Sequence, residues 1–280
     1  MNCEKEPVAF ADIDWNGLWY ESQIGRRPRF HDPTFWDKRA PEFARHVKTA
    51  DYTDQFIKIL QPHPEWRILD IGSAAGTLAV PLARQVAHVT AVDPSTGMRE
   101  LLKARCRKNS IDNIQIVDGR WEDDWTRLGI GVHDVAIASR SLIVKDLRNV
   151  ILKLQRYSTQ RVYLSTLVGD GPRDRKIVEA TGRCFNPGPD YIVVLNLLHQ
   201  MGIFPNLVFT CGRRQKTYHD VDDAVAGMRW MIQEMTPREE EKLRVHLAGT
   251  LVREGDRWKL PYNKIVRWAV IWWDVNDSEC

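Results

Sequence analysis

Residues 68–77 read ILDIGSAAGT, an apolar run that leads directly into a series of small residues. The run predicts a buried strand, and the following helix is expected to begin near Thr77. Gly72 can adopt positive φ, and Ser73 and Ala74 carry no bulky side chain, so a ligand can approach the backbone here. Unpaired N–H groups at the start of the helix would add hydrogen-bond donors. This stretch therefore predicts a strand, a ligand-binding loop and a helix in succession.

The spacing of the small residues separates two kinds of glycine-rich loop. A GxGxxG loop for a nicotinamide dinucleotide, placed on Gly72, requires glycine at positions 74 and 77. The chain has Ala74 and Thr77 there, which disfavours an oxidoreductase. The arrangement that does fit has an acid, Asp70, two positions before the first glycine and Gly76 four positions after it.

The chain after this unit alternates between β-branched runs and amphipathic stretches, which predicts an α/β fold with a mostly parallel sheet. We expect strands at 67–71, 88–93, 114–117, 133–139, 161–168 and 206–211. Helices are expected at 77–85, 95–108, 146–157 and 190–200. Ser95 and Asp146 are of the residue types that cap helix N-termini. A late strand at 265–273 would insert into the sheet already formed.

Two regions lie outside this alternation. Residues 1–64 are aromatic-rich and helical in pattern, which predicts an N-terminal lid. Within about 212–264, apolar residues recur at helical spacing, and Thr236, Pro237 and Glu239 form a capping box, so we expect a helical insertion before the last strand. We therefore expect one α/β domain over 65–280, and not the two domains that the chain length alone suggests.

Composition excludes several classes of protein. The 280 residues carry 40 Lys and Arg against 37 Asp and Glu, and a net charge of +3 is too small for a dedicated nucleic-acid-binding protein. The longest apolar runs, such as 192–198, are far shorter than the ~20 residues of a membrane span, and the N-terminus lacks a signal-peptide pattern. Five scattered cysteines without a CxxC pair favour a reducing cytoplasm over zinc or a redox dithiol.

The pattern DxGxAxG over residues 70–76 resembles motif I of the class I S-adenosylmethionine-dependent methyltransferases, with alanine in place of the usual middle glycine. A second motif agrees, because Asp93 ends the next predicted strand and DPSTGM over 93–98 matches the family's acidic-x-Ser-x-x-Met pattern. A carboxylate there can accept both ribose hydroxyl protons, and Met98 offers an apolar surface to adenine. The alternative for Asp93 is an acid that caps the next helix.

After the third strand the family usually has an acid near the adenine amino group, but Arg120 takes that position here. Arginine cannot accept a hydrogen bond from the adenine amino group. Adenine would instead be recognised by backbone groups, by the carboxylate of Asp118 or Glu122, or by stacking on Trp121. Ser139 matches the position after the fourth strand where backbone contacts the methionine portion. The resemblance implies a cofactor site made of Asp70, Gly72, Ser73, Ala74, Gly76, Asp93, Pro94, Met98, Gly119, Arg120, Trp121 and Ser139.

Residues 35–43 resemble the aromatic-Trp-Asp-x-x-Ala-x-x-aromatic lead-in of the small-molecule branch that includes quinone-biosynthesis methyltransferases. In that branch a helix folds over the cofactor. Candidate substrate residues are Trp36, Arg39, Tyr52 and Arg140. Tyr52 would contact the amino-acid end of the cofactor or simply pack, and Arg39 would pair with the cofactor carboxylate or with a neighbouring acid.

The resemblance implies methyl transfer from S-adenosylmethionine to a small-molecule acceptor, with S-adenosylhomocysteine as product. Direct in-line displacement at a sulfonium needs no acid, so the protein's contribution is mostly alignment. His31, His133 and His199 are candidate bases by type only, and we name no catalytic residue. No carboxylate and histidine set resembles the metal site of catechol methyltransferases, so no metal is expected.

The acceptor is less well defined by the sequence. Residues 139–142 lack the Asn/Asp-Pro-Pro-aromatic motif of nucleic-acid amino methyltransferases, so nucleic acid is not the expected acceptor. The basic clusters at 26–29, 173–176 and 213–216 would favour an anionic acceptor if two of them flank the pocket. An RNA or protein methyltransferase and a non-catalytic S-adenosylmethionine-binding protein remain as alternatives.

Overall fold

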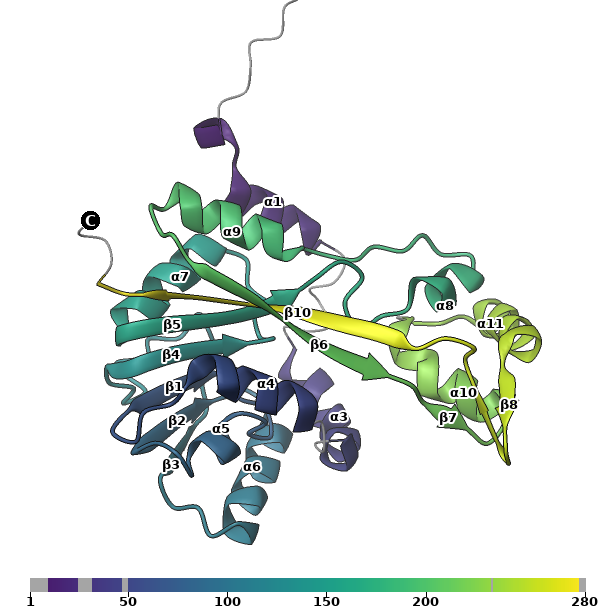
Figure 1. Ribbon diagram of the computed structural model, residues 1–280, viewed down its shortest axis with the longest axis horizontal. Coiled ribbons are helices and arrows are strands. Elements are labelled where there is room, and N and C mark those ends of the chain that lie inside the picture. The colour runs from purple at the N-terminus through teal and green to yellow at the C-terminus, as the bar shows by residue number, and fades with distance from the viewer. Residues whose placement is uncertain (1–9, 25–31, 47–49, 233, 277–280) are drawn as a thin grey trace, which may run out of the picture. The chain divides into compact units, whose positions relative to one another are not determined.

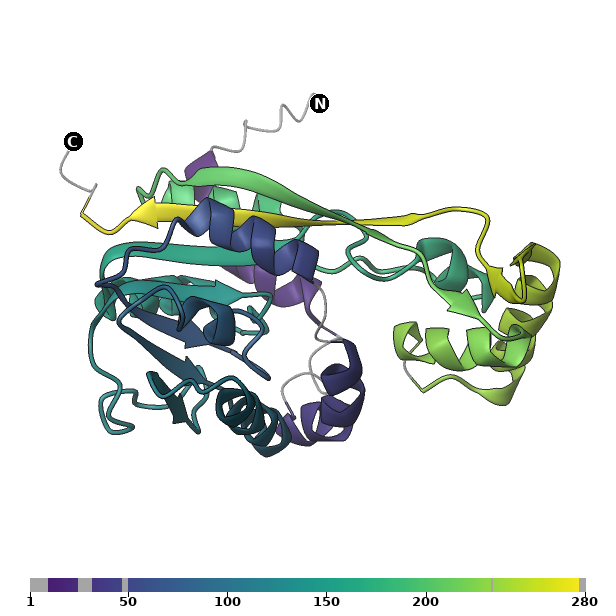
Figure 2. The same ribbon diagram turned by 60° about the horizontal axis from the view of Figure 1, so that its bottom comes forward.

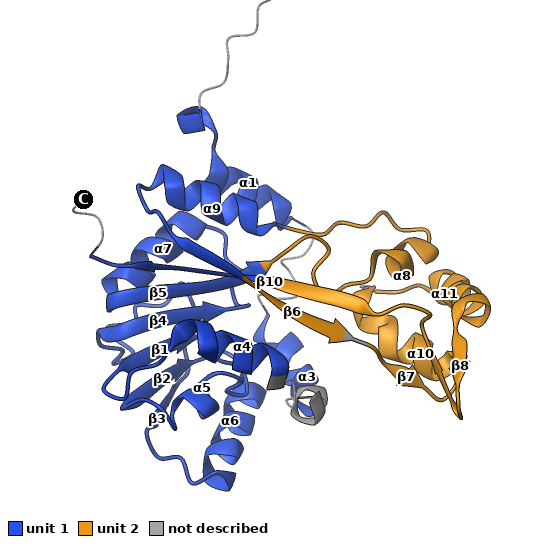
Figure 3. Cartoon of the chain, in the orientation of Figure 1, with its two compact units in different colours: residues 1–166, 189–208, 269–280 blue, residues 167–188, 209–268 orange. Residues whose placement is uncertain are grey.

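The computed structural model of the chain describes residues 10–24, 32–46, 50–232 and 234–276. The chain divides into two compact units, coloured in Figure 3. Unit 1 comprises Met1–Thr166, Pro189–Val208 and Ala269–Cys280, and unit 2 comprises Leu167–Gly188 and Phe209–Trp268. None of the helices in the described residues is both long and apolar enough to cross a membrane.

A seven-stranded sheet forms the centre of unit 1, with the order β3-β2-β1-β4-β5-β10-β6 (Figure 1). The strands are β1 (Arg67–Ile71), β2 (His88–Val92), β3 (Ile114–Val117), β4 (His133–Ser139), β5 (Ser158–Leu167), β6 (Asn206–Arg214) and β10 (Lys264–Asp274). The pairs β1–β2, β1–β4, β2–β3 and β4–β5 are parallel. The last strand, β10, runs antiparallel between β5 and β6 (Figure 2). The predicted mostly parallel sheet with a late antiparallel strand is confirmed.

Helices cover both faces of this sheet. They are α1 (Trp15–Ser22), α3 (Pro33–His46), α4 (Ala50–Leu60), α5 (Ala79–Leu82), α6 (Thr96–Lys108), α7 (Leu147–Arg156) and α9 (Tyr191–Gln200), preceded by the short η1 (Phe10–Asp12). Helices α4, α5 and α6 lie on one face, and α1, α7 and α9 lie on the other (Figures 1 and 2). Ser95 caps α6 and Asp146 caps α7 through their side-chain oxygens, as the sequence predicts.

Burial on both faces explains why the central strands are continuously apolar. Ile68 and Leu69 of β1 and Ile137 of β4 have no exposed surface. Each such side chain contributes about 1.5–3 kcal/mol of burial free energy. The chain moves outward from β1 through β2 to β3 and then returns to β4 on the other side of β1. In sheets of this type, ligands bind at the carboxyl ends of the two neighbouring strands between which the strand order reverses. Here those strands are β1 and β4, so we expect the site at their carboxyl ends.

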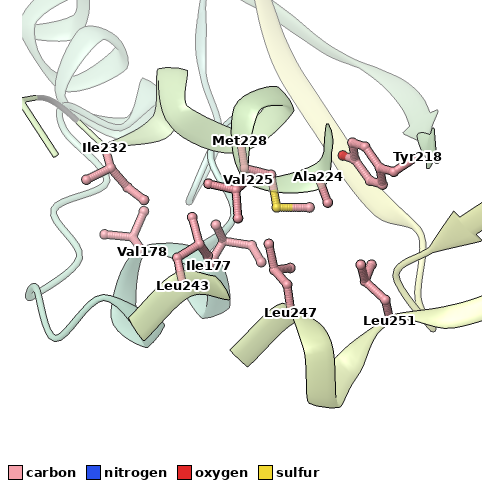
Figure 4. Close-up of a cluster of buried hydrophobic side chains, with 10 residues drawn as sticks. All are labelled: Ile177, Val178, Tyr218, Ala224, Val225, Met228, Ile232, Leu243, Leu247 and Leu251. Atoms are coloured by element: carbon pink, nitrogen blue, oxygen red, sulfur yellow. The ribbon is translucent and has the colours of Figure 1, made fainter. Parts of the chain in front are cut away.

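Unit 2 has its own core. Its elements are α8 (Arg175–Ala180), β7 (Thr217–Tyr218), α10 (Val221–Met228), η2 (Arg229–Met231), α11 (Pro237–Thr250), β8 (Val252–Glu254) and β9 (Arg257–Lys259). The buried side chains in Figure 4 come mainly from α8, α10 and α11: Ile177, Val178, Tyr218, Ala224, Val225, Met228, Ile232, Leu243, Leu247 and Leu251. The predicted capping box is present, because the Thr236 side chain accepts from the backbone of Glu239 and the Glu239 side chain accepts from that of Thr236.

The structure adds features that the sequence did not predict. The insertion before the last strand contains the expected helices α10 and α11, but it also contains a three-stranded antiparallel sheet, β7-β9-β8. Its strands have two or three residues, too few to give a period-2 pattern. Some boundaries differ as well: the helix expected at 77–85 is reduced to Ala79–Leu82, and β6 continues past Cys211 to Arg214.

Candidate functional site

The loop after β1 passes three times through the left-handed region of backbone conformation. The φ angles are +74° at Gly72, +48° at Ala74 and +75° at Gly76. The carbonyl of Val92, at the end of β2, accepts hydrogen bonds from the backbone N–H of Gly72 at 2.8 Å and of Ser73 at 3.1 Å. Glycine adopts this conformation without strain, whereas an L-residue pays about 1–2 kcal/mol, so Ala74 is held in a strained state.

Both glycines of this loop also stand close to other side chains. A Cβ added at Gly72 would overlap the side chain of Ser141, and one added at Gly76 would overlap that of Leu102. Close approach and positive φ therefore both require glycine at these two positions. Ala74 departs from the family's pattern in residue type but keeps the backbone conformation that a glycine would adopt.

Asp93 joins the first and second loops. One carboxylate oxygen, Oδ2, accepts the backbone N–H of Ala74 at 2.8 Å, and Oδ1 accepts that of Ser95 at 2.9 Å. Burial raises the pKa of this carboxyl, and the two backbone donors oppose that effect. Arg99 extends the arrangement by donating to the carbonyl of Asp93 at 2.8 Å and to the carboxylate of the exposed Asp118 at 2.7 Å. Ser95, and not Asp93, supplies the side-chain cap of α6.

Asp70 is the most perturbed acid of the site. It is buried at the end of β1, and burial, reinforced by the nearby charge of Asp93, raises its pKa to about 7, while Arg140 acts in the opposite direction. Its Oδ2 and the hydroxyl of Ser73 are buried without a hydrogen-bond partner among the described residues. Buried polar atoms of a native protein are almost always hydrogen-bonded, so two such atoms beside one loop fit a polar ligand.

Helix α3 is fastened to the N-terminus of α6. The Oδ1 of Asp37 accepts the hydroxyl of Ser95 at 2.6 Å and the backbone N–H of Gly97 at 2.8 Å. These hydrogen bonds lower the pKa of Asp37, and a carboxylate at a helix N-terminus is also favoured by the helix dipole. The sequence analysis did not assign this role to Asp37, although the residue belongs to the aromatic-Trp-Asp lead-in.

Met98 lies beneath this helix. Its side chain is 1% exposed and packs with Ala40 of α3 and Ala75 of the first loop, with Trp36 against the same cluster. Two predicted site residues, Trp36 and Met98, are thus in one cluster with the edge of the loop. In this arrangement α3 covers the apolar surface that Met98 was expected to offer to adenine.

The loop after β3 is tied down by hydrogen bonds to its backbone. Arg120 donates its N–H to the carboxylate of Asp123 at 2.8 Å, and its carbonyl accepts the indole N–H of Trp125 at 2.9 Å. Lys153 of α7 donates to the carbonyls of Trp121 at 2.8 Å and Asp123 at 2.6 Å. The Arg120 side chain is exposed, and Lys153, which sequence analysis did not identify, holds the loop.

Ser141 connects three loops. Its hydroxyl donates to the carbonyl of Ile71 at 2.7 Å, and its own carbonyl accepts the indole N–H of Trp121 at 3.2 Å. Its side chain also occupies the space beside Gly72. Gly119 is buried in the same region. Ser141, which was not a predicted site residue, therefore links the predicted residues Gly72 of the first loop and Trp121 of the third.

Tyr52 and Arg140 meet at the carboxyl ends of β4 and β5. Tyr52 is buried, and its hydroxyl lies 2.7 Å from the hydroxyl of Ser139 and 2.8 Å from that of Ser165. The guanidinium carbon of Arg140 lies 4.1 Å from the centre of the Tyr52 ring. Arg140 itself has φ +57°, a second strained residue at the site. Burial raises the pKa of Tyr52 despite the Arg140 charge.

Other predicted residues lie elsewhere. Arg39 stacks on Phe35 at 5.3 Å, and His199 contacts Phe10 on the α9 side of the sheet. His133 lies at the opposite end of β4 from the site, where burial lowers its pKa to about 4. His31 and the cluster at 26–29 are outside the described residues. Pro94 lies between Asp93 and Ser95. The basic clusters at 173–176 and 213–216 belong to unit 2.

Comparison with known families gives the identity of the central region. Residues 68–158 match a family model described as a methyltransferase domain. The chain carries a methyltransferase domain. The matched segment begins in β1 and ends at the first residue of β5, so it includes the loops after β1, β2, β3 and β4.

Three similar proteins place the methyltransferase domain in context. An uncharacterized protein of Haemophilus influenzae is 29% identical over 276 residues, which is 96% of this chain and 99% of that protein. A solved structure from Bacillus halodurans, assigned as a methyltransferase, has a TM-score of 0.54 at 12% identity and covers 80% of this chain and 98% of its own. A 23S rRNA (uracil(1939)-C(5))-methyltransferase of Methylococcus capsulatus is 42% identical over 60 residues, 21% of this chain and 13% of that protein.

The residues of the site fit S-adenosylmethionine, the methyl donor that the sequence resemblance implies. The loop of residues 72–76 exposes no bulky side chain and is turned by three left-handed residues. Asp70 Oδ2 and the Ser73 hydroxyl, which have no hydrogen-bond partner among the described residues, can accept hydrogen bonds from polar groups of such a donor. Within the described residues, no group of three or more potential metal ligands is present.

Proposed function

We propose that this domain transfers a methyl group from S-adenosylmethionine to a small-molecule acceptor. The observation that carries the proposal is the loop at 72–76, with positive φ at three residues, together with two buried oxygens, of Asp70 and Ser73, that have no hydrogen-bond partner among the described residues. Such a loop recognises a ligand through backbone and small side chains, and the acids at the ends of β1 and β2 add charge.

Each part of the site has a proposed role. Asp93, fixed by two backbone donors, would bind the ribose hydroxyls with its remaining lone pairs. Asp70 would attract the positively charged amino-acid end. The loop containing Gly119, Arg120 and Trp121 would bind adenine, with the indole ring in place of the missing acid.

The chemistry requires mostly alignment from the protein. When bound, S-adenosylmethionine supplies a methyl group on a sulfonium, whose departure needs no proton. Holding the reactants in near-attack geometry can supply about 7–11 kcal/mol of the barrier. Ser139, at the carboxyl end of β4, would contact the methionine portion of the donor, and Tyr52 of α4, whose hydroxyl lies 2.7 Å from that of Ser139, would define the acceptor side of the site.

We also propose that residues 1–64 act as a lid on a domain spanning 65–280. The support is the contact of α3 with α6 through Asp37, which covers Met98. A lid of this kind would exclude water from the sulfonium. Because α3 covers Met98, adenine contact with that side chain requires movement of α3.

The preference for a small molecule rests on two features. The chain has a net charge of only +3, and residues 139–142 read SRSL. The local likeness to an rRNA methyltransferase makes RNA the second candidate acceptor. We place the protein in the cytoplasm, because its five cysteines are scattered along the chain and include no CxxC pair.

Calorimetric titration with S-adenosylmethionine and S-adenosylhomocysteine tests the cofactor site. Asp93→Ala is expected to weaken both by at least tenfold, while the control Asp112→Ala, an exposed acid before β3, leaves them unchanged. Thermal unfolding of each variant shows whether it is folded. Equal binding by the Asp93→Ala variant and the wild type would contradict the proposed site.

Labelled methyl donor then tests the acceptor class. The protein is incubated with a cell extract separated into small molecules, RNA and protein. We expect label in the small-molecule fraction. Label in RNA would establish the second candidate, and binding of the donor without transfer to any fraction would favour a non-catalytic binding protein.

A further inference from the structure

Helix α1 is hydrogen-bonded to the loop that follows β4. We propose that Trp19 and Gln23 of this helix are positioning residues for the donor site: they hold the carbonyl of Val144, and through Ser141 they act on the loop at 72–76. This inference rests on the proposed function, because its main consequence is the affinity for the methyl donor.

Both side chains donate to the same acceptor. The indole N–H of Trp19 lies 3.0 Å from the carbonyl oxygen of Val144, and the side-chain amide nitrogen of Gln23 lies 3.2 Å from that oxygen. Trp19 is 1% exposed and Gln23 is 4% exposed. A buried donor that loses its acceptor is costly, so each of these residues disfavours any movement of the carbonyl. Together they fix the position of Val144.

Other contacts hold α1 in place along its length. The side chain of Asn16 donates to the carboxylate of Asp146 at 3.2 Å and accepts the backbone N–H of Arg148 at 3.0 Å. Gln200 of α9 donates to the carbonyl of Ile13, just before the helix, at 3.0 Å. Figure 1 shows α1 beside α7 and α9 on the same face of the sheet. Within the N-terminal region, α1 is therefore a fixed support, and α3 is the part that would move.

A short turn connects Val144 to Ser141. The backbone N–H of Ile143 donates to the carbonyl of Ser141 at 2.8 Å, which closes a three-residue turn. Leu142 and Val144 are buried, with 7% and 2% of their surface exposed. Close-packed segments transmit small displacements because they contain little free space. A shift of the Val144 carbonyl would therefore move Ser141.

Ser141 is the point at which this turn meets the donor site. Its hydroxyl donates to the carbonyl of Ile71, and its side chain fills the space beside Gly72. Its carbonyl accepts the indole N–H of Trp121 from the loop after β3. A site that recognises its ligand through backbone groups depends closely on their spacing, which supporting residues must maintain. Helix α1 would thus affect donor affinity without contacting the donor.

Two substitutions remove the donors to Val144. Trp19→Phe keeps an aromatic ring but lacks the indole N–H, and Gln23→Met keeps the side-chain length but lacks the amide. The double variant leaves the carbonyl without either donor. Asn16→Ala is the matched control, because it removes contacts of the same helix with the start of α7 and not with the turn.

Three properties are measured for each variant. Calorimetry gives the affinity for S-adenosylhomocysteine, and thermal unfolding gives the melting temperature. Amide hydrogen exchange at residues 72–76 is followed without any ligand, because it reports on the loop itself. All three measurements are repeated for the double variant in a Ser141→Ala background, where the hydroxyl contact with Ile71 is already lost.

We expect each single variant to bind S-adenosylhomocysteine about two- to threefold more weakly than wild type, and the double variant about fivefold or more. Exchange at residues 72–76 should accelerate in the double variant. Asn16→Ala should lower the melting temperature but leave affinity and exchange at wild-type values. In the Ser141→Ala background the double substitution should cost less than about twofold, because residues that act through one another are not additive.

Several results would overturn the inference. Unchanged affinity or unchanged exchange in the folded double variant would do so, as would a full loss of affinity in the Ser141→Ala background or an equal loss in Asn16→Ala. Gln23→Met, the smaller change, decides the matter if the double variant is unfolded. Failure of wild type to bind S-adenosylhomocysteine would remove the proposed function, whereas exchange would still report whether α1 holds the loop.

Discussion

The carboxylate of Asp93 accepts the backbone N–H of Ala74 at 2.8 Å, so the acid at the end of β2 holds the strained residue in the loop after β1. The two motifs that resemble the methyltransferase family are therefore parts of one hydrogen-bonded unit. The same acid accepts the N–H of Ser95, which begins the next helix segment. The carboxylate that we propose binds the ribose thus also fixes the local backbone.

Replacing Ala74 with glycine should stabilise the protein. Glycine removes the left-handed strain, about 1–2 kcal/mol, but adds about 0.5–1 kcal/mol of entropy to the unfolded chain. We expect the free energy of unfolding to rise by about 0.5–1 kcal/mol in urea titration, with an unchanged m-value. Gly72→Ala is the opposing control, because its new Cβ overlaps Ser141, and it should destabilise the fold. A loss of stability in Ala74→Gly would show that Ala74 is not strained.

Donor binding should depend on pH through Asp70. Its pKa is about 7, so the carboxylate is mostly neutral at pH 6 and mostly ionised at pH 8. The affinity for the positively charged S-adenosylmethionine is expected to increase several-fold over this range. Calorimetric titration of Asp70→Asn should show weaker binding without that increase. A slope retained in Asp70→Asn would assign the pH dependence to another group.

The raised pKa of Asp70 also predicts that the free energy of unfolding decreases as pH rises, whereas donor affinity increases. The pKa of Asp70 is raised in the fold from 3.8 to about 7, so the unfolded chain releases this proton more readily. Stability is lost as pH rises from about 4 to about 7, by at most about 4 kcal/mol for this one group. Asp70→Asn should therefore unfold at a higher temperature than wild type at pH 8 and differ little at pH 4. Equal melting temperatures at pH 8 would contradict the raised pKa.

Removal of the Asp37 carboxylate should loosen α3 without unfolding the sheet. Asp37→Ala removes acceptors for Ser95 and Gly97, a change of about 1 kcal/mol at a helix N-terminus. Hydrogen exchange across residues 33–40 is expected to accelerate, while β1 and β4 remain protected. Asp112→Ala, which removes an exposed carboxylate before β3 and outside α3, serves as the control. Unchanged exchange in Asp37→Ala would show that other contacts hold α3.

Lys153 should affect donor affinity from a distance. Lys153→Met keeps much of the apolar stem but removes the ammonium that binds the carbonyls of Trp121 and Asp123. S-adenosylhomocysteine affinity should fall severalfold, because the loop after β3 loses its anchor. Lys103→Met, an exposed lysine on α6, should have no such effect. Wild-type affinity in Lys153→Met would mean that the loop is held without it.

The sequence predicts local features of this protein well. The strand and loop at 68–76, the Ser95 cap and the Thr236 capping box each depend on residues within a few positions of one another. Contacts across the chain were not predicted: Asp37 reaches α6 about 60 residues away, and Lys153 reaches a loop about 30 residues earlier. Nothing in the local pattern of either residue specifies its partner, because tertiary packing brings them together.

The position of β10 has a consequence for synthesis. This strand lies between β5 and β6 but is the last to leave the ribosome. Until Lys264–Asp274 emerges, the nascent chain has both neighbouring strands without the partner that joins them. Unpaired strand edges are templates for association with other chains. A message truncated shortly before this segment would therefore yield a protein that retains the methyltransferase match at residues 68–158 yet is prone to aggregate.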